Sequence, residues 1–351
     1  MNAADFRLAA ERRATTKPRL LITRRIPEPG WSLAREHFDV IGGEEDQALA
    51  RERLLEAVRG VDALLCLLTE TVDAMVMDAS GGTLRVISNM AVGYDNIDVT
   101  AATARGILVT NTPGVLTDAT ADLAWALILS VARRVVEGDR MVREGRFQRW
   151  SPFLLLGRSL TGATLGIVGM GRIGQAVARR ALGFDMRVLY TKRSGPLPPE
   201  LVPSAARWEY CTSLDQLLRQ ADIVSLHVPL EDATRHLISR RELALMKPGA
   251  FLINTSRGPV VDELALVEAL RDGRLGGAGL DVYEHEPELA PGLADLTNVV
   301  LLPHLGSATV ETRGRMAELA VQNLVAYFQG KPIPHPVNPE VLGPPEGRRS
   351  R

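Results

Sequence analysis

The sequence is poor in the features that distinguish several specialised classes of protein. Only two of its 351 residues are cysteines, Cys66 and Cys211, which excludes a disulfide framework and favours a reducing compartment. Neither sign of charge is in excess: 41 Lys and Arg face 42 Asp and Glu, and a formal charge of -1 provides no positive field for nucleic acid. No apolar run approaches the ~20 residues that span a bilayer, and residues 1–17 lack the apolar core of a secretory signal. We therefore expect a cytoplasmic protein with no metal, no nucleic-acid partner and no membrane segment.

What remains is the composition of an ordinary folded protein. Hydrophobic residues make up 46% of the chain and charged residues 24%, both near the globular average. At ~150 residues per domain, the length predicts about two domains, each long enough to bury a core.

Short apolar segments alternate with amphipathic stretches along the chain. In the first part, strands are predicted at residues 19–23, 62–67 and 85–88, with a polar amphipathic stretch over 46–59. In the second part, strands are predicted at residues 164–168, 187–190, 223–226, 250–254, 277–281 and 299–302. Strands that are continuous apolar runs separated by helices predict an α/β fold with parallel sheets covered on both faces.

Two helices define the expected domain organisation. Apolar positions at helical spacing over 117–143 predict one long helix that leaves the first domain, with Thr117 or Asp118 as N-cap and Gly145 just past its end. A second amphipathic helix over 310–328 is the candidate for a return to the first domain. We therefore expect a discontinuous substrate-binding domain at residues 18–116 and 308–340. A nucleotide-binding domain is expected at residues 117–307, and disordered tails at residues 1–17 and 343–351.

A glycine motif follows the strand at 164–168. Gly169, Gly171 and Gly174 form GxGxxG between this strand and a helix predicted over 175–182. In that context the glycines let the backbone approach a pyrophosphate at a helix N-terminus. A glycine-rich turn without a ligand is the alternative, and the strand and helix on either side argue against it. The motif predicts a Rossmann-type, doubly wound dinucleotide-binding sheet.

The tip of the next strand indicates which dinucleotide is used. An NAD site usually has a carboxylate there for the ribose hydroxyls, but this tip reads Thr191, Lys192, Arg193 and Ser194. Cations and hydroxyls suit the 2′-phosphate of NADP(H), which we therefore expect to be preferred. The alternative, that these are solvated loop cations and that NAD(H) is used, remains open.

Three polar residues follow predicted strand ends in the same half of the chain: Arg257, Glu286 and His304. In doubly wound sheets ligands bind beyond these ends. A guanidinium can bind a carboxylate, a histidine can exchange a proton near neutral pH, and a neighbouring Glu stabilises its charged form. Together they indicate a 2-oxo acid reductase. Taken singly, each residue also has a purely structural interpretation. Arg257 could be a helix-capping surface cation, Glu286 a turn residue before Pro287, and His304 a hydrogen-bonded histidine.

Several motifs together resemble the D-isomer specific 2-hydroxyacid dehydrogenase family. They lie at residues 169–174, 254–262, 279–287 and 303–309, and the resemblance covers about residues 17–338. Within the family the sequence is most similar to glyoxylate/hydroxypyruvate reductases, through residues 64–69, 90–95 and 191–194. This resemblance implies a Rossmann-type domain plus a smaller flavodoxin-like α/β substrate domain, and a homodimer.

The resemblance also implies residue roles. Arg257 would bind the substrate carboxylate and carbonyl, His304 would be the acid/base, and Glu286 would be its partner. The implied cofactor-binding residues are Gly169, Gly171, Arg172, Ile173, Gly174, Thr191, Lys192, Arg193, Ser194, Val228, Pro229, Thr234, Thr255, Ser256, Arg257, Asp281, His304 and Gly306. The implied substrate-binding residues are Leu68, Val92, Gly93, Arg257, His304, Ser307 and, from the neighbouring subunit, Trp150.

The expected activity is NADPH-dependent reduction of glyoxylate to glycolate and of hydroxypyruvate to D-glycerate. Val92 stands where related phosphite-oxidising enzymes carry Lys, which argues against that chemistry. Two alternatives remain: a dehydrogenase for another small 2-oxo acid, and a dinucleotide-sensing co-repressor of the same fold. No basic segment or long disordered tail is present to support the co-repressor.

Overall fold

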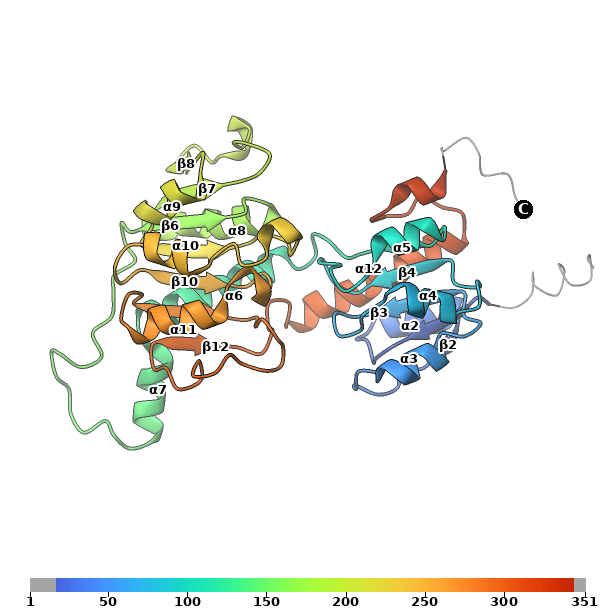
Figure 1. Ribbon diagram of the computed structural model, residues 1–351, viewed down its shortest axis with the longest axis horizontal. Coiled ribbons are helices and arrows are strands. Elements are labelled where there is room, and N and C mark those ends of the chain that lie inside the picture. The colour runs from blue at the N-terminus through green and yellow to red at the C-terminus, as the bar shows by residue number, and fades with distance from the viewer. Residues whose placement is uncertain (1–16, 344–351) are drawn as a thin grey trace, which may run out of the picture. The chain divides into compact units, whose positions relative to one another are not determined.

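The computed structural model describes residues 17–343, which form two compact units (Figure 1). One unit contains residues 17–115 and 309–343, and the other contains residues 116–308. Apart from Lys17 and Gly343, the predicted disordered tails lie outside the described residues.

The N-terminal unit is built on a five-stranded parallel sheet in the order β2-β1-β3-β4-β5. Its strands are β1 (Arg19–Ile22), β2 (Asp39–Ile41), β3 (Ala63–Cys66), β4 (Val86–Asn89) and β5 (Leu108–Thr110). Its helices are α2 (Gly30–His37), α3 (Arg51–Ala57), α4 (Ala74–Ala79), α5 (Val99–Ala104), α12 (Val310–Phe328) and the short η5 (Pro339–Leu342). The order is that of flavodoxin-like folds, as expected for the smaller domain.

The helix α12 packs onto this sheet although at least 200 residues separate the two in sequence. Its Ala320 carbonyl accepts a hydrogen bond of 2.8 Å from the hydroxyl of Ser88 on β4. Met316, Ala317, Ala320, Val321 and Leu324 are buried. The apolar face of α12 therefore covers part of the N-terminal unit.

The second unit contains a seven-stranded, fully parallel sheet in the order β12-β11-β10-β9-β6-β7-β8. Its strands are β6 (Thr164–Val168), β7 (Arg187–Thr191), β8 (Trp208–Tyr210), β9 (Ile223–Leu226), β10 (Phe251–Asn254), β11 (Gly277–Leu280) and β12 (Val299–Leu301). The chain runs outward from β6 in one direction and from β9 in the other, so the topological switch point lies between β6 and β9. The predicted doubly wound α/β fold is confirmed.

Helices cover both faces of this sheet, with a separate apolar core on each side (Figure 1). One face carries α9 (Leu214–Gln220), α10 (Arg240–Leu245) and α11 (Glu263–Arg271), which bury Leu217, Leu243 and Leu266. The other face carries α6 (Thr117–Ala132) and α8 (Arg172–Arg180), which bury Leu127 and Val177. Five short helical turns and connections complete the unit: α7 (Val135–Arg143), η1 (Ala181–Phe184), η2 (Pro199–Leu201), η3 (Asp232–Thr234) and η4 (Gly258–Val260).

The prediction of one unbroken helix over 117–143 is wrong. The helix ends at Ala132, Arg134 adopts the left-handed conformation with φ of 55°, and α7 begins at Val135. The cause is a distant segment: the amide of Arg158 donates to the Ala132 carbonyl at 2.8 Å, and a Cβ on Gly157 would lie 2.3 Å from the same oxygen. The Ala132 carbonyl therefore accepts a hydrogen bond from Arg158, and not from the amide that would continue the helix. Neither Thr117 nor Asp118 is the N-cap, because α6 starts after Leu116 without a side-chain cap.

Within residues 17–343, no helix has both the length and the apolar character required to cross a membrane.

Candidate active site

The predicted site residues of the second unit gather at one edge of its sheet. Because all seven strands are parallel, their carboxyl ends share that edge. The residues that follow β6, β7, β9, β10, β11 and β12 there include Gly169, Lys192, Val228, Thr255, Asp281 and His304. This is the edge at which ligands bind in doubly wound sheets, next to the switch point between β6 and β9.

The glycine motif forms a tight turn from β6 into α8. Gly169 has φ of 97°, and a Cβ there would lie 2.5 Å from the carbonyl oxygen of His227, so only glycine fits. A Cβ on Gly174 would lie 2.2 Å from the Gly169 oxygen, which brings the helix against the strand. Gly171 caps α8 and has open space around an added Cβ. Arg172 and Ile173 follow in the first turn of α8. The backbone amides at this helix N-terminus are therefore donors suited to a pyrophosphate.

A second feature that fits a bound dinucleotide is the hydroxyl of Thr255, directly after β10. Its oxygen is buried and has no hydrogen-bond partner among the described residues. Buried hydroxyls usually have partners, so this one is available to a ligand. Ser256, the next residue, is instead engaged with Asn254.

The tip of β7 carries the two predicted cations in different environments. Lys192 opens a tight turn closed by Gly195 (N to Lys192 O, 3.2 Å) and forms no ion pair within residues 17–343. Arg193 pairs with Glu231 at 2.6 Å. Glu231 in turn precedes η3, where its amide donates to the Thr234 hydroxyl at 2.8 Å. One of the two cations expected to meet the 2′-phosphate is thus already held by a carboxylate.

The hydroxyl of Thr234 also donates to the Pro229 carbonyl at 2.7 Å, next to Val228. The loop after β9, with its three implied cofactor residues, is therefore stabilised by its own side chains.

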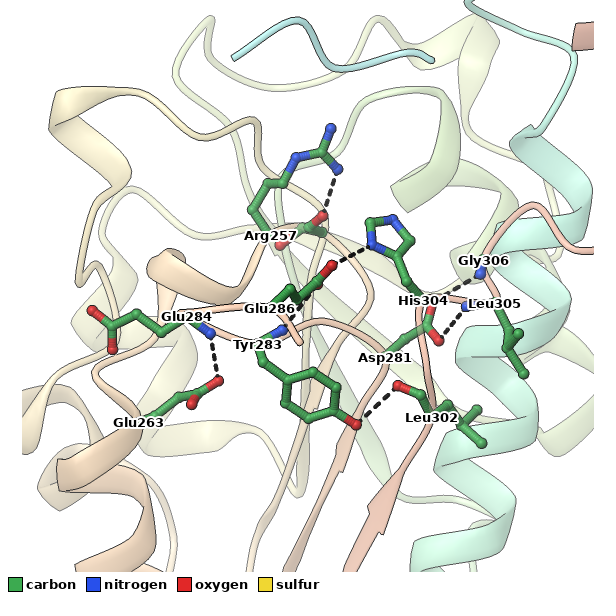
Figure 2. Close-up of polar contacts among 11 residues, drawn as sticks. Arg257, Glu263, Asp281, Tyr283, Glu284, Glu286, Leu302, His304, Leu305 and Gly306 are labelled. Atoms are coloured by element: carbon green, nitrogen blue, oxygen red, sulfur yellow. Dashed lines mark hydrogen bonds and ion pairs between the residues drawn. The ribbon is translucent and has the colours of Figure 1, made fainter. Parts of the chain in front are cut away.

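Glu286 and His304 form a direct pair. His304 Nδ1 lies 3.0 Å from Glu286 Oε2, and Figure 2 shows the ring facing the carboxylate. A carboxylate can only accept, so Nδ1 donates, and the outer nitrogen Nε2 remains for proton exchange. Both side chains are about one-third exposed, at 33% and 37%, so a ligand can reach them.

The surroundings of Glu286 keep it ionised. Burial alone would raise its pKa, but the hydrogen bond and charge of His304, the Tyr283 amide and the charge of Arg257 outweigh it, and the pKa of Glu286 falls below its usual value. The Tyr283 amide donates to Glu286 Oε1 at 3.1 Å. An ionised Glu286 stabilises the positive form of the His304 imidazole.

Arg257 lies on the turn that follows β10. The Asn254 side chain fixes this turn: its amide donates to the Arg257 carbonyl at 2.9 Å, and its oxygen accepts from the amide of Ser256 at 3.0 Å. Figure 2 shows the Arg257 guanidinium and the His304 ring projecting to the same side of the loops that carry them. The structure thus brings Arg257, Glu286 and His304 together.

Asp281 is buried beneath the histidine loop. Its carboxylate accepts the amides of Leu305 at 2.6 Å and Gly306 at 2.8 Å, and its carbonyl accepts the amide of His304 at 2.9 Å (Figure 2). Burial raises the pKa of Asp281 despite these amides. These bonds hold His304 in its left-handed conformation, with φ of 56°, and place Ser307 just beyond the loop.

The other predicted substrate residues belong elsewhere in the chain. Leu68 follows β3, and Val92 and Gly93 follow β4, so these three lie at the carboxyl edge of the N-terminal sheet. Trp150 lies between α7 and β6 and is 76% exposed. None of these four is on the edge that carries His304. Among the described residues, no group of three or more His, Cys, Asp or Glu side chains could hold a metal ion.

Sequence reasoning missed three residues that shape this site: Asn254, Tyr283 and Glu231. Asparagine followed by Thr255 and Ser256 at a strand end is a turn signal that could have revealed Asn254. The Tyr283 hydroxyl donates to the Leu302 carbonyl at 2.9 Å, and burial raises the pKa of Tyr283 to about 12, so it remains a donor. The partnership of Glu231 with Arg193 had no signal in the local sequence.

Comparison with known proteins agrees with this geometry. Residues 125–306 match the family model described as D-isomer specific 2-hydroxyacid dehydrogenase, NAD binding domain. The glyoxylate reductase of Thermococcus onnurineus is 51% identical over 330 residues, which cover 93% of this chain and 97% of the relative.

Solved structures show the same similarity over nearly the whole chain. A protein of Thermus thermophilus is 50% identical with a TM-score of 0.84, and the match covers 91% of this chain and 99% of that one. The NADPH-dependent glyoxylate/hydroxypyruvate reductase of Sinorhizobium meliloti, solved with NADP and malonate, is 35% identical with a TM-score of 0.80, covering 92% and 97%. The chain therefore belongs to the D-isomer specific 2-hydroxyacid dehydrogenase family and is an NAD(P)-dependent oxidoreductase.

Proposed function

We propose that the protein reduces glyoxylate to glycolate, and hydroxypyruvate to D-glycerate, with NADPH. The observation that carries this proposal is the 3.0 Å pair of His304 and Glu286, with Arg257 beside it at the ligand-binding edge of the sheet. Relatives that share about half of their residues with this chain are named glyoxylate reductases, which supports the choice of substrate.

In this proposal Arg257, His304 and Glu286 each have a separate role. Arg257 binds the substrate carboxylate and polarises the carbonyl oxygen. His304 donates its Nε2 proton to that oxygen as the carbonyl becomes a hydroxyl, while Glu286 stabilises the imidazolium before the transfer. The bound nicotinamide supplies the hydride that the carbonyl carbon receives.

The remaining substrate contacts follow from the resemblance. In this proposal the backbone amides of Val92 and Gly93 bind the substrate carboxylate, and Leu68 and Ser307 line the pocket. Trp150 reaches the pocket of a neighbouring subunit.

Preference for NADPH rests on the tip of β7. No carboxylate lies at Thr191–Ser194 to accept the ribose hydroxyls or repel a phosphate. Because Glu231 already holds Arg193, we assign most of the attraction for the 2′-phosphate to Lys192. The related Sinorhizobium enzyme, named NADPH-dependent, was solved with NADP, which supports this choice.

We further propose a homodimer located in the cytoplasm. The segment from α7 to β6 exposes many large apolar side chains, and α7 has no buried residue. The exposed side chains are Val135, Val136, Val142, Phe147, Trp150, Phe153, Leu154 and Leu156. A surface of this kind suits burial against a second copy of the chain. Both cysteines are unpaired, which fits a reducing compartment.

A panel of 2-oxo acids assayed with NADPH and with NADH tests the function. We expect the highest kcat/KM for glyoxylate and hydroxypyruvate with NADPH, and chiral analysis should identify D-glycerate. A higher kcat/KM for pyruvate or a bulkier 2-oxo acid would assign a different substrate, and absence of turnover with every acid would refute the enzyme function.

A further inference from the structure

The loop that follows β4 is held by its carbonyl groups. The Ala91 carbonyl accepts from the backbone amide of Thr112 at 2.8 Å, and the Val92 carbonyl accepts from the side-chain amide of Asn111 at 2.8 Å. The next carbonyl, that of Gly93, accepts from the side-chain amide of Asn89 at 2.9 Å. Three consecutive peptide oxygens therefore have fixed partners.

These bonds determine where the loop's N–H groups point. In a trans peptide the N–H points opposite to the carbonyl of the preceding residue, and these peptides are trans. The Ala91 and Val92 carbonyls both face residues 111–112, so the N–H groups of Val92 and Gly93 both point away from that segment, to one common side. Within the described part of the chain neither N–H donates a hydrogen bond. Two free, parallel donors suit an anion such as a carboxylate.

Asn111 is itself rigidly placed. It follows β5, its backbone amide donates to the His335 carbonyl at 3.3 Å, and its carbonyl accepts from the side chain of Asn323 at 3.0 Å. Its side chain can therefore act as a fixed donor to the loop, and replacing that side chain leaves both backbone anchors in place.

Asn89 holds the loop from the opposite end. It is the last residue of β4, is fully buried, and also donates to Asn96 at 2.9 Å. Asn96 in turn donates to the carbonyls of Leu67 at 2.9 Å and Glu70 at 3.0 Å, on either side of Leu68. The network thus links the two loops that carry the predicted substrate residues of this unit.

We infer that Asn111 and Asn89 are positioning residues that aim the Val92 and Gly93 amides at the carboxylate of a 2-oxo acid. This inference rests on the proposed function, in which those two amides bind the substrate. Asparagine suits the task because its amide donates to a carbonyl without adding a charge near an anionic substrate. Aspartate at either position would have the same shape, but its oxygens would repel the carbonyl.

Asn111→Asp and Asn111→Ala test the inference by steady-state kinetics. For Asn111→Asp we expect the KM for glyoxylate to rise at least 10-fold while kcat falls less than threefold, because only carboxylate binding is impaired. Asn111→Ala, which removes the donor without adding a charge, should have a smaller effect on KM. The dissociation constant for NADPH, measured by fluorescence, should change less than twofold.

A neutral substrate separates positioning from general damage. Methyl glyoxylate has the same aldehyde but no carboxylate, so its kcat/KM should be equal in wild type and both Asn111 variants. Asn338→Asp is the matched control: Asn338 donates to the Ile107 carbonyl at 3.0 Å in the same unit, away from the loop. That change should lower Tm and leave the KM for glyoxylate unaltered.

In the kinetic assays, two results would overturn the inference: equal losses with methyl glyoxylate and glyoxylate, or a fall in kcat with unchanged KM. Binding of oxamate to the NADPH complex, measured by calorimetry, separates this inference from the proposed function. If the wild type binds oxamate but does not reduce glyoxylate, only the proposed function is refuted. In that case Asn111→Asp should still raise the dissociation constant for oxamate at least 10-fold. Undiminished oxamate binding in that variant, or none in wild type, would refute the inference.

Discussion

The charge states of a few residues determine the chemistry of the candidate site. Replacing His304 by Ala should lower kcat/KM by about 10²–10⁴-fold, because the proton donor to the carbonyl oxygen is lost. Replacing Arg257 by Ala should cost at least as much, since it removes both the carboxylate partner and the charge at the oxygen. His285→Ala, a change to an exposed histidine of the preceding loop, is the matched control. Steady-state assays with glyoxylate check all three, and near-normal turnover in either site variant would contradict the assignment.

The partnership of Glu286 with His304 predicts a specific pH dependence. The pKa of Glu286 lies below its usual value, so the carboxylate is ionised at neutral pH and its stabilising contribution is lost only as pH falls through that lowered pKa. Glu286→Gln removes the negative charge at every pH, so the imidazolium form of His304 loses its partner. The alkaline limb of the rate profile for reduction should therefore move to lower pH. Glu288→Gln, an exposed change two residues on, should leave the profile in place; a Glu286→Gln profile identical to wild type would be evidence against the pair.

Cofactor preference should depend on Lys192 more than on Arg193. Lys192→Asp removes attraction for the 2′-phosphate and adds an acceptor for the ribose hydroxyls, so the NADPH to NADH ratio of kcat/KM should fall by about 10-fold or more. Glu231→Gln should raise the ratio, because it frees Arg193 from its 2.6 Å ion pair. Asp232→Asn, on the same turn, serves as the control. The wild-type preference for NADPH should shrink as the salt concentration rises. If neither Lys192→Asp nor added salt changes the NADPH to NADH ratio of kcat/KM, there is no phosphate site at this strand end.

Among the structural elements, the loop that follows β12 and carries His304 is held by Asp281, the residue that follows β11. The buried carboxylate of Asp281 should therefore affect both stability and activity. Because burial raises the pKa of Asp281, its ionised form is disfavoured in the folded state, and the associated stability is lost as pH rises through that raised pKa. Asp281→Asn removes the charge but places an NH₂ group opposite one of the two amides, Leu305 or Gly306.

We therefore expect Asp281→Asn to be at least as stable as wild type at pH 7, with an advantage that disappears in acid. Its kcat should nevertheless fall by about 10–100-fold, because the loop that places His304 shifts. Urea unfolding at pH 7 and pH 4, together with steady-state assays, would check both parts. Loss of stability at neutral pH with full activity would be the opposite outcome.

At the scale of the whole molecule, the exposed apolar segment between α7 and β6 predicts self-association. Phe153 is 80% exposed and Trp150 is 76% exposed, which makes them the two most exposed large aromatic side chains of this segment. Phe153→Glu should convert the proposed dimer to a monomer, because a charge in an apolar interface is not solvated. Leu264→Glu, on the exposed face of α11, is the control and should not change the mass. Size-exclusion chromatography with light scattering measures both, and a wild-type monomer would refute the proposal.

The sequence by itself determined which segments form strands and helices where a single local pattern dominates. The predicted strands at 164–168 and 223–226 and the helix at 310–328 coincide with β6, β9 and α12, because continuous apolar runs and helical periodicity depend only on neighbours in the chain. The short strands β2, β5 and β8, of three residues each, gave no comparable pattern and were not predicted. The glycine motif was also readable locally, since its tight turn needs glycine at Gly169 whatever lies around it.

Only the tertiary structure decided which of these segments meet. Arg257, Glu286 and His304 follow three different strands, and they converge because β10, β11 and β12 are adjacent in the sheet order. The helix break after Ala132 comes from the distant amide of Arg158, and the partner of Arg193 is 38 residues away in Glu231. The direction of the Val92 and Gly93 amides depends on residues 111–112 in the same way. Periodicity and propensity act over a few residues, whereas these contacts depend on loop closures between strand ends, which no local pattern encodes.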